Sequence, residues 1–174
     1  NLAWLEDLVP WQFTDKWVQI ERALNTPVCT GEDIYLKEGF RPLLEARAVN
    51  VIHPDLATSG GILETKRIGD LAQEHGISMA MHMAGTPIST MASVHCAAAT
   101  QNFIALEHHF TEVPFWGDFI DGVPKPIIQD GYITVPDGPG LGFEINPDAI
   151  REHLVPDDPG FFEPTPEWDV QHSW

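Results

Sequence analysis

Five short apolar runs in the first 110 residues each end at a titratable side chain. The runs begin near residues 2, 27, 49, 77 and 103, and they end at Glu6, Glu32, Asp55, His82 and Glu107. Between them, apolar residues recur at helical spacing over residues 14–24, 42–48, 62–76 and 88–99. This repeat of 22 to 28 residues predicts alternating strands and helices, and therefore an α/β fold with a parallel sheet wrapped by helices.

The carboxyl ends of these strands are where we expect a functional site. In parallel α/β sheets and barrels, ligands bind outside the carboxyl ends of the strands, where side chains from different strands converge. The five strand-end groups are therefore candidates for a single active site.

Beyond Phe110 the pattern changes. Residues 126–129 and 132–135, joined by Asp130-Gly131, predict a hairpin with a tight turn, and residues 147–154 predict a short helix. We expect two regions, residues 1–110 with the βα units and residues 111–174 with the hairpin, the short helix and the tail. The tail should pack on surface outside this chain, because it carries aromatic side chains that are costly to leave in water, Phe161, Phe162, Trp168 and Trp174.

Composition excludes some classes of function. The chain has 174 residues, 43% of them hydrophobic, which is enough for one domain with a sizeable core. Its net charge of -17 would repel phosphate backbones and anionic lipid surfaces. No apolar run approaches the ~20 residues that cross a bilayer, and Cys29 and Cys96 lie in apolar stretches, as in a reducing compartment. We expect a cytoplasmic protein without a nucleic-acid or membrane partner.

Glu6 and Glu32 are candidate metal ligands. A single strand-end carboxylate often only accepts hydrogen bonds from the next helix. Two on neighbouring strands would repel each other unless a cation lay between them, and an oxygen-only set favours Mg²⁺. Because Mg²⁺ takes about six oxygens, a third protein ligand would come from outside this chain.

Asp55 and His82 are a second candidate pair. The carboxylate can fix the tautomer of the imidazole, orient its ring and raise its basicity, as a general acid or base requires. Glu107 ends the next strand, where neighbouring carboxylates favour its protonated form, able to donate a hydrogen bond to a developing oxyanion. A solvated loop carboxylate is the equal alternative for Glu107.

A cation on one side and a base on the other can remove the proton α to a carboxylate. The metal ion holds the substrate carboxylate and stabilises the enediolate while His82 takes the proton. A zinc hydrolase is the weaker hypothesis, because the sequence has no His-x-His or HExxH pattern. Its ligands would come from His53, His82, His108 and His109.

The five motifs together resemble the mandelate racemase branch of the enolase superfamily, and within it the acid-sugar dehydratases such as the D-galactonate dehydratases. The matching segments are WLEDLVP with Glu6, PVCTGE with Glu32, PDLATSGGI with Asp55, AMH with His82 and ALEHH with Glu107. Their separations of 26, 23, 27 and 25 residues also resemble the family's. The later PGLGFEI segment is similar to the family's C-terminal part.

The resemblance implies roles for these residues. Glu6 and Glu32 would be the second and third Mg²⁺ ligands, and His82 with Asp55 would be the catalytic dyad. Glu107 would assist at the substrate carboxylate. Asp7, a shorter carboxylate, stands where the family has a glutamate.

The resemblance also implies what these residues lack. The family's first three barrel strands, its first metal ligand and its N-terminal capping domain have no counterpart here. Five strands cannot close an eight-stranded barrel. We therefore expect the C-terminal five βα units of a TIM-type (β/α) barrel, completed by the N-terminal half of the same enzyme.

The expected function is that of a Mg²⁺-dependent lyase in sugar-acid breakdown. Removal of the α proton and loss of the β-hydroxyl would convert a small sugar acid into a 2-keto-3-deoxy acid. Two alternatives stay open: racemisation or epimerisation of a 2-hydroxy acid through the same enediolate, and a non-catalytic barrel scaffold. Because capped barrels often assemble, we expect a homo-oligomer.

Overall fold

A parallel sheet forms the centre of the computed structural model, which describes residues 1–110 and 112–156. Its strands pair in chain order, and all four pairings are parallel. The strands are β1 (Leu5–Glu6), β2 (Val28–Thr30), β3 (Val51–Ile52), β4 (Ser78–Met81) and β5 (Phe103–Leu106). The predicted α/β fold with a parallel sheet of five βα units is confirmed.

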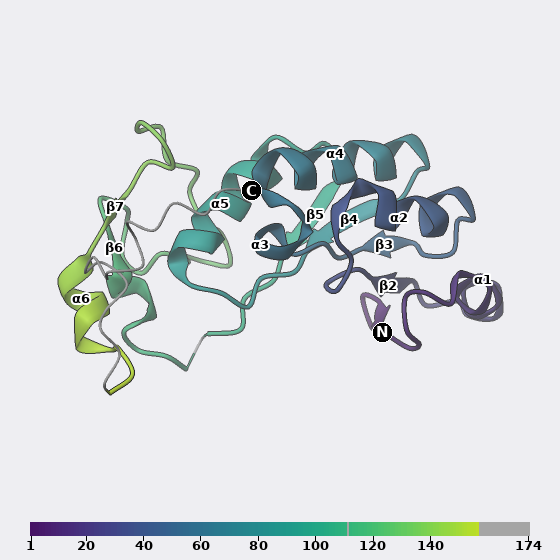
Figure 1. Ribbon diagram of the computed structural model, residues 1–174, viewed down its shortest axis with the longest axis horizontal. Coiled ribbons are helices and arrows are strands. Elements are labelled where there is room, and N and C mark those ends of the chain that lie inside the picture. Colours follow the sequence, from purple (N-terminus) through teal and green to yellow (C-terminus); the bar gives the residue numbers. More distant parts are fainter. Residues whose placement is uncertain (111, 157–174) are drawn as a thin grey trace, which may run out of the picture.

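Helices connect successive strands. They are α1 (Thr14–Ala23), α2 (Leu36–Glu45), α3 (Leu56–Ser59), α4 (Gly61–Glu74) and α5 (Pro87–Ala98). Figure 1 shows α2, α4 and α5 on the same side of the sheet. The main core lies between these helices and the sheet, and it includes Phe40, Ile68 and Met79.

The other face of the sheet bears a smaller apolar cluster. Cys29, Val51 and Ala80 are buried there, and Trp4 and Ala105 pack against them. Successive side chains of a strand point to opposite faces, so these residues alternate with strand residues of the main core. The same alternation governs which strand-end groups meet.

Helix α2 begins earlier than the sequence pattern predicted. Helical spacing was expected from residue 42, but residues 37–40 also belong to the helix, and Pro42 lies inside it. Phe40, Leu43 and Leu44 explain the difference, because they form one buried stripe at helical spacing. Burial of this stripe outweighs the one backbone hydrogen bond that Pro42 cannot donate.

The hairpin predicted at residues 126–135 is reduced to its turn. Gln129 and Tyr132 form a single antiparallel bridge. Between them Asp130 and Gly131 have φ values of 51° and 82°, as a tight hairpin turn requires.

The two-stranded antiparallel sheet lies elsewhere, between β6 (Ile120–Asp121) and β7 (Glu144–Ile145). Strand β6 follows the 3-10 helix η1 (Trp116–Phe119). The predicted short helix is α6 (Pro147–Glu152). The four tail aromatics of the sequence analysis lie outside the described residues.

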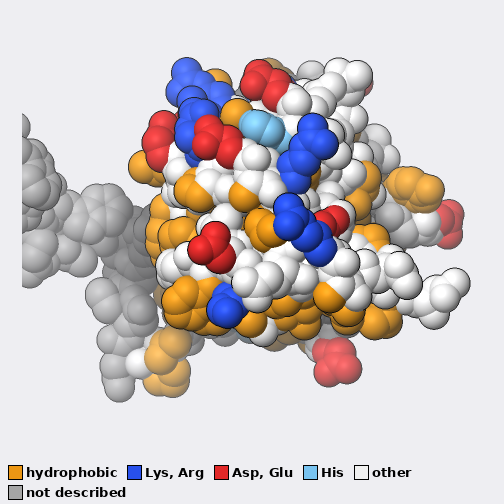
Figure 2. Space-filling view, turned by 90° about the vertical axis from the view of Figure 1, so that its right-hand side faces the viewer, with side chains coloured by type: hydrophobic (Ala, Val, Ile, Leu, Met, Phe, Trp, Pro, Cys, Tyr) orange, Lys and Arg blue, Asp and Glu red, His pale blue; other side chains and the backbone are white. Residues whose placement is uncertain are grey.

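On the face in Figure 2, Lys and Arg side chains lie among Asp and Glu side chains, and hydrophobic side chains are most frequent in the lower part. Among the described residues, no helix combines the length and the apolar character that crossing a bilayer requires.

Candidate active site

Strand pairing brings the five predicted strand-end groups to one edge of the sheet. Glu6 lies opposite Cys29 in the pairing of β1 with β2. A parallel bridge joins Asp55 to His82 beyond the ends of β3 and β4. The backbone N–H of Glu107 donates to the carbonyl of Met81 at 2.9 Å, which continues the ladder past β5. All five groups therefore lie at the carboxyl ends of the strands.

Asp55 and His82 form a hydrogen-bonded pair. His82 Nδ1 lies 2.7 Å from Asp55 Oδ2, and both side chains are 16% exposed. The other oxygen, Oδ1, accepts the backbone N–H of Ala57 at 2.7 Å and caps α3. Because a carboxylate oxygen accepts hydrogen bonds, Nδ1 of the imidazole carries a hydrogen, and Nε2 is the ring nitrogen that can exchange a proton with a substrate.

The free ring nitrogen of His82 faces carboxylates from two other strands. Its Nε2 lies 3.2 Å from Glu32 Oε2 and 3.6 Å from Glu107 Oε2. A substrate atom that meets Nε2 therefore lies between Glu32 and Glu107.

Glu107 is held as a carboxylate. Its Oε1 lies 2.6 Å from His109 Nε2, and its Oε2 accepts the backbone N–H of Met83 at 3.3 Å. Burial raises the pKa of Glu107, but these hydrogen bonds and the nearby rings of His53 and His82 lower it, so the net pKa lies below its ordinary value. These contacts favour the ionised form of Glu107 over the neutral carboxylic acid expected from the sequence.

Three carboxylates gather where β1 and β2 end. One oxygen each from Glu6, Asp7 and Glu32 lies within 4.8 Å of the others. The side chains of Glu6 and Glu32 are 33% and 38% exposed, so solvent ions can reach them. An all-oxygen set of this kind fits Mg²⁺, with remaining positions left to water and substrate. Asp7 thus lies beside the two predicted ligands.

Gly31 lets the chain turn just before Glu32. Its φ is 148°, and a Cβ there would lie 2.9 Å from both His53 N and Phe40 Cε1. A side chain at this position would collide with the backbone that carries the next strand end. Only glycine fits the turn that aims Glu32 at the site.

Asp7 ties the ends of two strands together. It adopts a φ of 48°, unusual for a residue with a side chain. Its Oδ1 accepts the hydroxyl hydrogen of Thr30 at 2.5 Å, which links β1 to β2. Beside it, the indole N–H of Trp4 donates to Glu6 Oε2 at 2.8 Å. These contacts fix the directions of the Glu6 and Asp7 carboxylates.

His53 is a central residue that the sequence analysis named only in the weaker zinc hypothesis. Its side chain is 2% exposed, and its ring lies edge-on to His82 at a centroid distance of 5.3 Å. The sequence could have indicated this role, because His53 lies two residues before Asp55 and residues i and i+2 of a strand point to the same face.

Cys29 also lies beside the site. Burial raises the pKa of its thiol, and the charges of Glu6, Asp7 and Glu107 raise that pKa further. The thiol therefore stays protonated and unreactive while no cation is near.

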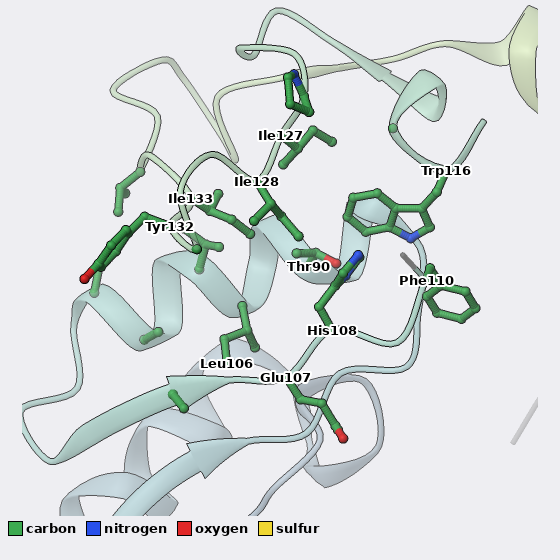
Figure 3. A pocket seen from close by; sticks show the side chains of 18 of the residues that line it. Thr90, Leu106, Glu107, His108, Phe110, Trp116, Ile127, Ile128, Tyr132 and Ile133 are labelled. Atoms are coloured by element: carbon green, nitrogen blue, oxygen red, sulfur yellow. The ribbon is translucent and has the colours of Figure 1, made fainter. Parts of the chain in front are cut away.

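A cavity of about 920 Å³ lies next to β5, and Glu107 and His108 are among the residues that line it. The rest of the lining comes from α5, β5 and the segment after residue 113 and is mostly apolar. Figure 3 shows Leu106 and His108 on the cavity side of the strand and the carboxylate of Glu107 pointing away. Alternation along the strand thus separates the apolar cavity from the catalytic candidates.

Comparison with known proteins agrees with this arrangement. Residues 1–149 match the family model described as Enolase C-terminal domain-like. The chain belongs to this family. The resemblance drawn from the five motifs is therefore confirmed.

Relatives within the family carry several names. D-xylonate dehydratase of Haloferax volcanii is 41% identical over 155 residues, which cover 89% of this chain and 37% of that protein. D-galactarolactone cycloisomerase of Agrobacterium fabrum is 32% identical over 165 residues, which cover 90% of this chain and 43% of that protein.

Solved structures give the same result. A mandelate racemase/muconate lactonizing enzyme-like protein from Rubrobacter xylanophilus matches with a TM-score of 0.85 and 39% identity. The match covers 88% of this chain and 39% of that one. The chain therefore spans roughly two fifths of the length of the proteins it matches.

Proposed function

We propose that the chain is the C-terminal part of a Mg²⁺-dependent lyase that dehydrates a sugar acid. The observation that carries the proposal is the Asp55–His82 pair, whose free Nε2 lies 3.2 Å from Glu32 Oε2. A candidate base and a carboxylate of the candidate cation site thus lie side by side. Relatives named D-xylonate dehydratase and D-galactonate dehydratase support the reaction class.

His82 would remove the proton on the carbon next to the substrate carboxylate. Its Nε2 takes the proton, and the electron pair of the broken C–H bond delocalises into the carboxylate as an enediolate. The β carbon–oxygen bond then breaks, and the hydroxide leaves as water with the proton held by His82. The resulting enol tautomerises to a 2-keto-3-deoxy acid.

Asp55 and Glu107 would assist this proton transfer. Asp55 Oδ2 accepts the hydrogen of Nδ1 and stabilises the imidazolium that forms on His82. Glu107 Oε2, 3.6 Å from His82 Nε2, adds a second negative charge near the imidazolium. The ring is therefore stabilised at both nitrogens once it carries the proton.

Glu6, Asp7 and Glu32 would hold the metal ion. When bound, Mg²⁺ supplies positive charge that offsets the charge developing on the substrate carboxylate. A cavity of about 750 Å³ lined by Asp7, Thr30 and Glu32, among others, borders this group and offers room for a small polyhydroxy acid.

The remainder of the barrel would come from outside these residues. Strands β1 and β5 are the two edges of the sheet, each with one unpaired side. Unpaired strand edges favour pairing with further strands. We propose that the N-terminal half of the same enzyme supplies three more strands, a further metal ligand and the group opposite His82. Residues 1–110 would then form the barrel portion and residues 111–174 the appended segment.

The test uses the complete polypeptide with Mg²⁺ and a panel of sugar acids, with 2-keto-3-deoxy acid as the measured product. We expect His82→Asn to lower kcat by at least about 10²–10⁴-fold while Mg²⁺ affinity stays unchanged. His75→Asn is the matched control, because His75 lies at the opposite end of β4. Undiminished turnover by His82→Asn would refute the proposal. Deuterium uptake at the α carbon without loss of water would instead identify a racemase or epimerase.

A further inference from the structure

We propose a second metal site, for a zinc-like divalent cation, formed by Glu6, Cys29 and His53. The three residues come from adjacent strands and lie on the sheet face opposite α2, α4 and α5. Their ligand atoms all lie within 4.8 Å of one another. A set of one carboxylate oxygen, one sulfur and one imidazole nitrogen suits Zn²⁺ and not Mg²⁺, which takes oxygen ligands.

His53 supplies the observation that points to a ligand. Its Nδ1 lies 2.8 Å from the carbonyl oxygen of Ala80, which can only accept, so Nδ1 carries a hydrogen. Its Nε2 is buried and has no hydrogen-bond partner among the described residues. Metal-binding histidines typically donate their other ring N–H to a carbonyl or carboxylate in this way.

Two carboxylate oxygens lie near this buried nitrogen. Glu107 Oε2 lies 3.4 Å from Nε2 and Glu6 Oε2 lies 3.7 Å from it. A cation bound to Nε2 and Glu6 would give the buried nitrogen a partner and would be held by negative charge on both sides.

The separation of His53 Nε2 and Glu6 Oε2 suits tetrahedral coordination. Ligand atoms of a tetrahedral zinc ion lie roughly 3.4–3.6 Å apart, given its bond lengths. The 3.7 Å between His53 Nε2 and Glu6 Oε2 is close to this spacing. Cys29 lies opposite Glu6 in the strand register and would bind as a thiolate, its proton passing to solvent. Glu107 Oε2 or a water completes the four ligands.

Glu6 belongs to both metal groups. A zinc-like ion bound with Cys29 and His53 would draw Glu6 away from Asp7 and Glu32, so Zn²⁺ should compete with Mg²⁺. This competition alone rests on the proposed function; binding at the second site does not.

Cobalt(II) added to the complete polypeptide tests the site directly, because a cobalt–thiolate bond gives a charge-transfer absorption band. We expect the band in the wild-type protein, its loss on adding Zn²⁺, and its loss in Cys29→Ser. Cys96→Ser should retain it, because Cys96 is buried on α5 outside the cluster. His53→Gln should weaken Zn²⁺ binding by more than the roughly 10–100-fold that loss of an outer partner costs.

Three results would overturn the proposal: no charge-transfer band in a folded wild-type protein, a band that survives Cys29→Ser, or unchanged Zn²⁺ affinity in His53→Gln. Circular dichroism of each variant checks folding. If Cys29→Ser does not fold, the His53→Gln affinity decides. Loss of the band leaves the dehydratase proposal untouched, since that proposal is measured by product formation with Mg²⁺.

Discussion

Asp55 uses its two carboxylate oxygens for two different tasks, and this division can be tested at the scale of one residue. Oδ1 caps α3 and Oδ2 holds His82 Nδ1. An asparagine keeps the cap but turns an NH₂ group toward the ring, which favours the wrong tautomer of His82. We expect Asp55→Asn to lower kcat by about 10²–10⁴-fold with little loss of stability.

The control for Asp55→Asn is Asp70→Asn, which removes a carboxylate paired with Lys66 on the surface of α4. Steady-state kinetics and thermal unfolding of both variants provide the measurement. Equal kcat values for the two variants would contradict the role given to Asp55.

His108 should make the stability of the protein sensitive to acid. Burial lowers the pKa of His108, and the charge of His109 lowers it further. The folded state therefore favours the neutral ring, which lies edge-on to Trp116 at 4.7 Å. This contribution to stability is complete above the ordinary pKa of 6.5 and is lost as pH falls through the lower folded value.

We expect His108→Phe to keep the packing and to reduce the difference in Tm between about pH 7.5 and about pH 5.5. His75→Phe, at the end of α4, should leave that difference unchanged. A Tm difference in His108→Phe as large as in the wild-type protein would show that His108 titrates alike in both states.

Single residues also show where sequence reasoning succeeds and where it stops. Strand ends could be located because apolar runs and their spacing mark them, so Glu6, Glu32 and His82 were predicted as neighbours. The charge of Glu107 could not be predicted, because it depends on contacts with His109 and Met83 N–H that exist only in the fold. The pattern of apolar and polar residues does not indicate such contacts.

At the scale of elements, long periodic segments were predicted better than short ones. Helix α4 and strands β4 and β5 follow clear apolar spacing and lie where expected. The predicted start of α2, at Pro42, was wrong, because the buried stripe that stabilises the helix begins earlier, at Phe40. Strands β6 and β7 were missed because, unlike the equally short β1 and β3, they lie outside the repeated strand–helix spacing of the first 110 residues.

The turn between β2 and α2 gives a prediction at this scale. Gly31→Ala places a Cβ 2.9 Å from His53 N and Phe40 Cε1 at a φ of 148°. We expect it to lower the free energy of unfolding by about 2–5 kcal/mol, from strain and overpacking together. It should also lower kcat, because Glu32 follows directly.

Gly76→Ala is the matched control for Gly31→Ala. Gly76 has a φ of 72° and nothing within 4 Å of a new Cβ. It should cost only the backbone strain, about 1–2 kcal/mol. Denaturant unfolding of both variants gives the comparison, and equal costs would mean that the close approach at Gly31 is relieved by small shifts.

At the scale of the whole molecule, the apolar core lies on one face of the sheet and the candidate catalytic groups lie at one edge of it. Helices α2, α4 and α5 cover one face (Figure 1), and the candidate groups lie at the carboxyl ends of the strands. The sheet also has two edge strands, and Ile104 on β5 is 51% exposed. These unpaired edges agree with a chain that matches only 37–43% of the length of its relatives.

The central claim is that His82, oriented by Asp55, removes the α proton of a sugar acid. The most direct measurement follows that proton by NMR in D₂O, using the complete polypeptide with Mg²⁺ and the sugar acid it converts. We predict that the wild-type protein removes the α proton and that His82→Asn binds the same acid without removing it. Removal of the α proton by His82→Asn at the wild-type rate would contradict the account.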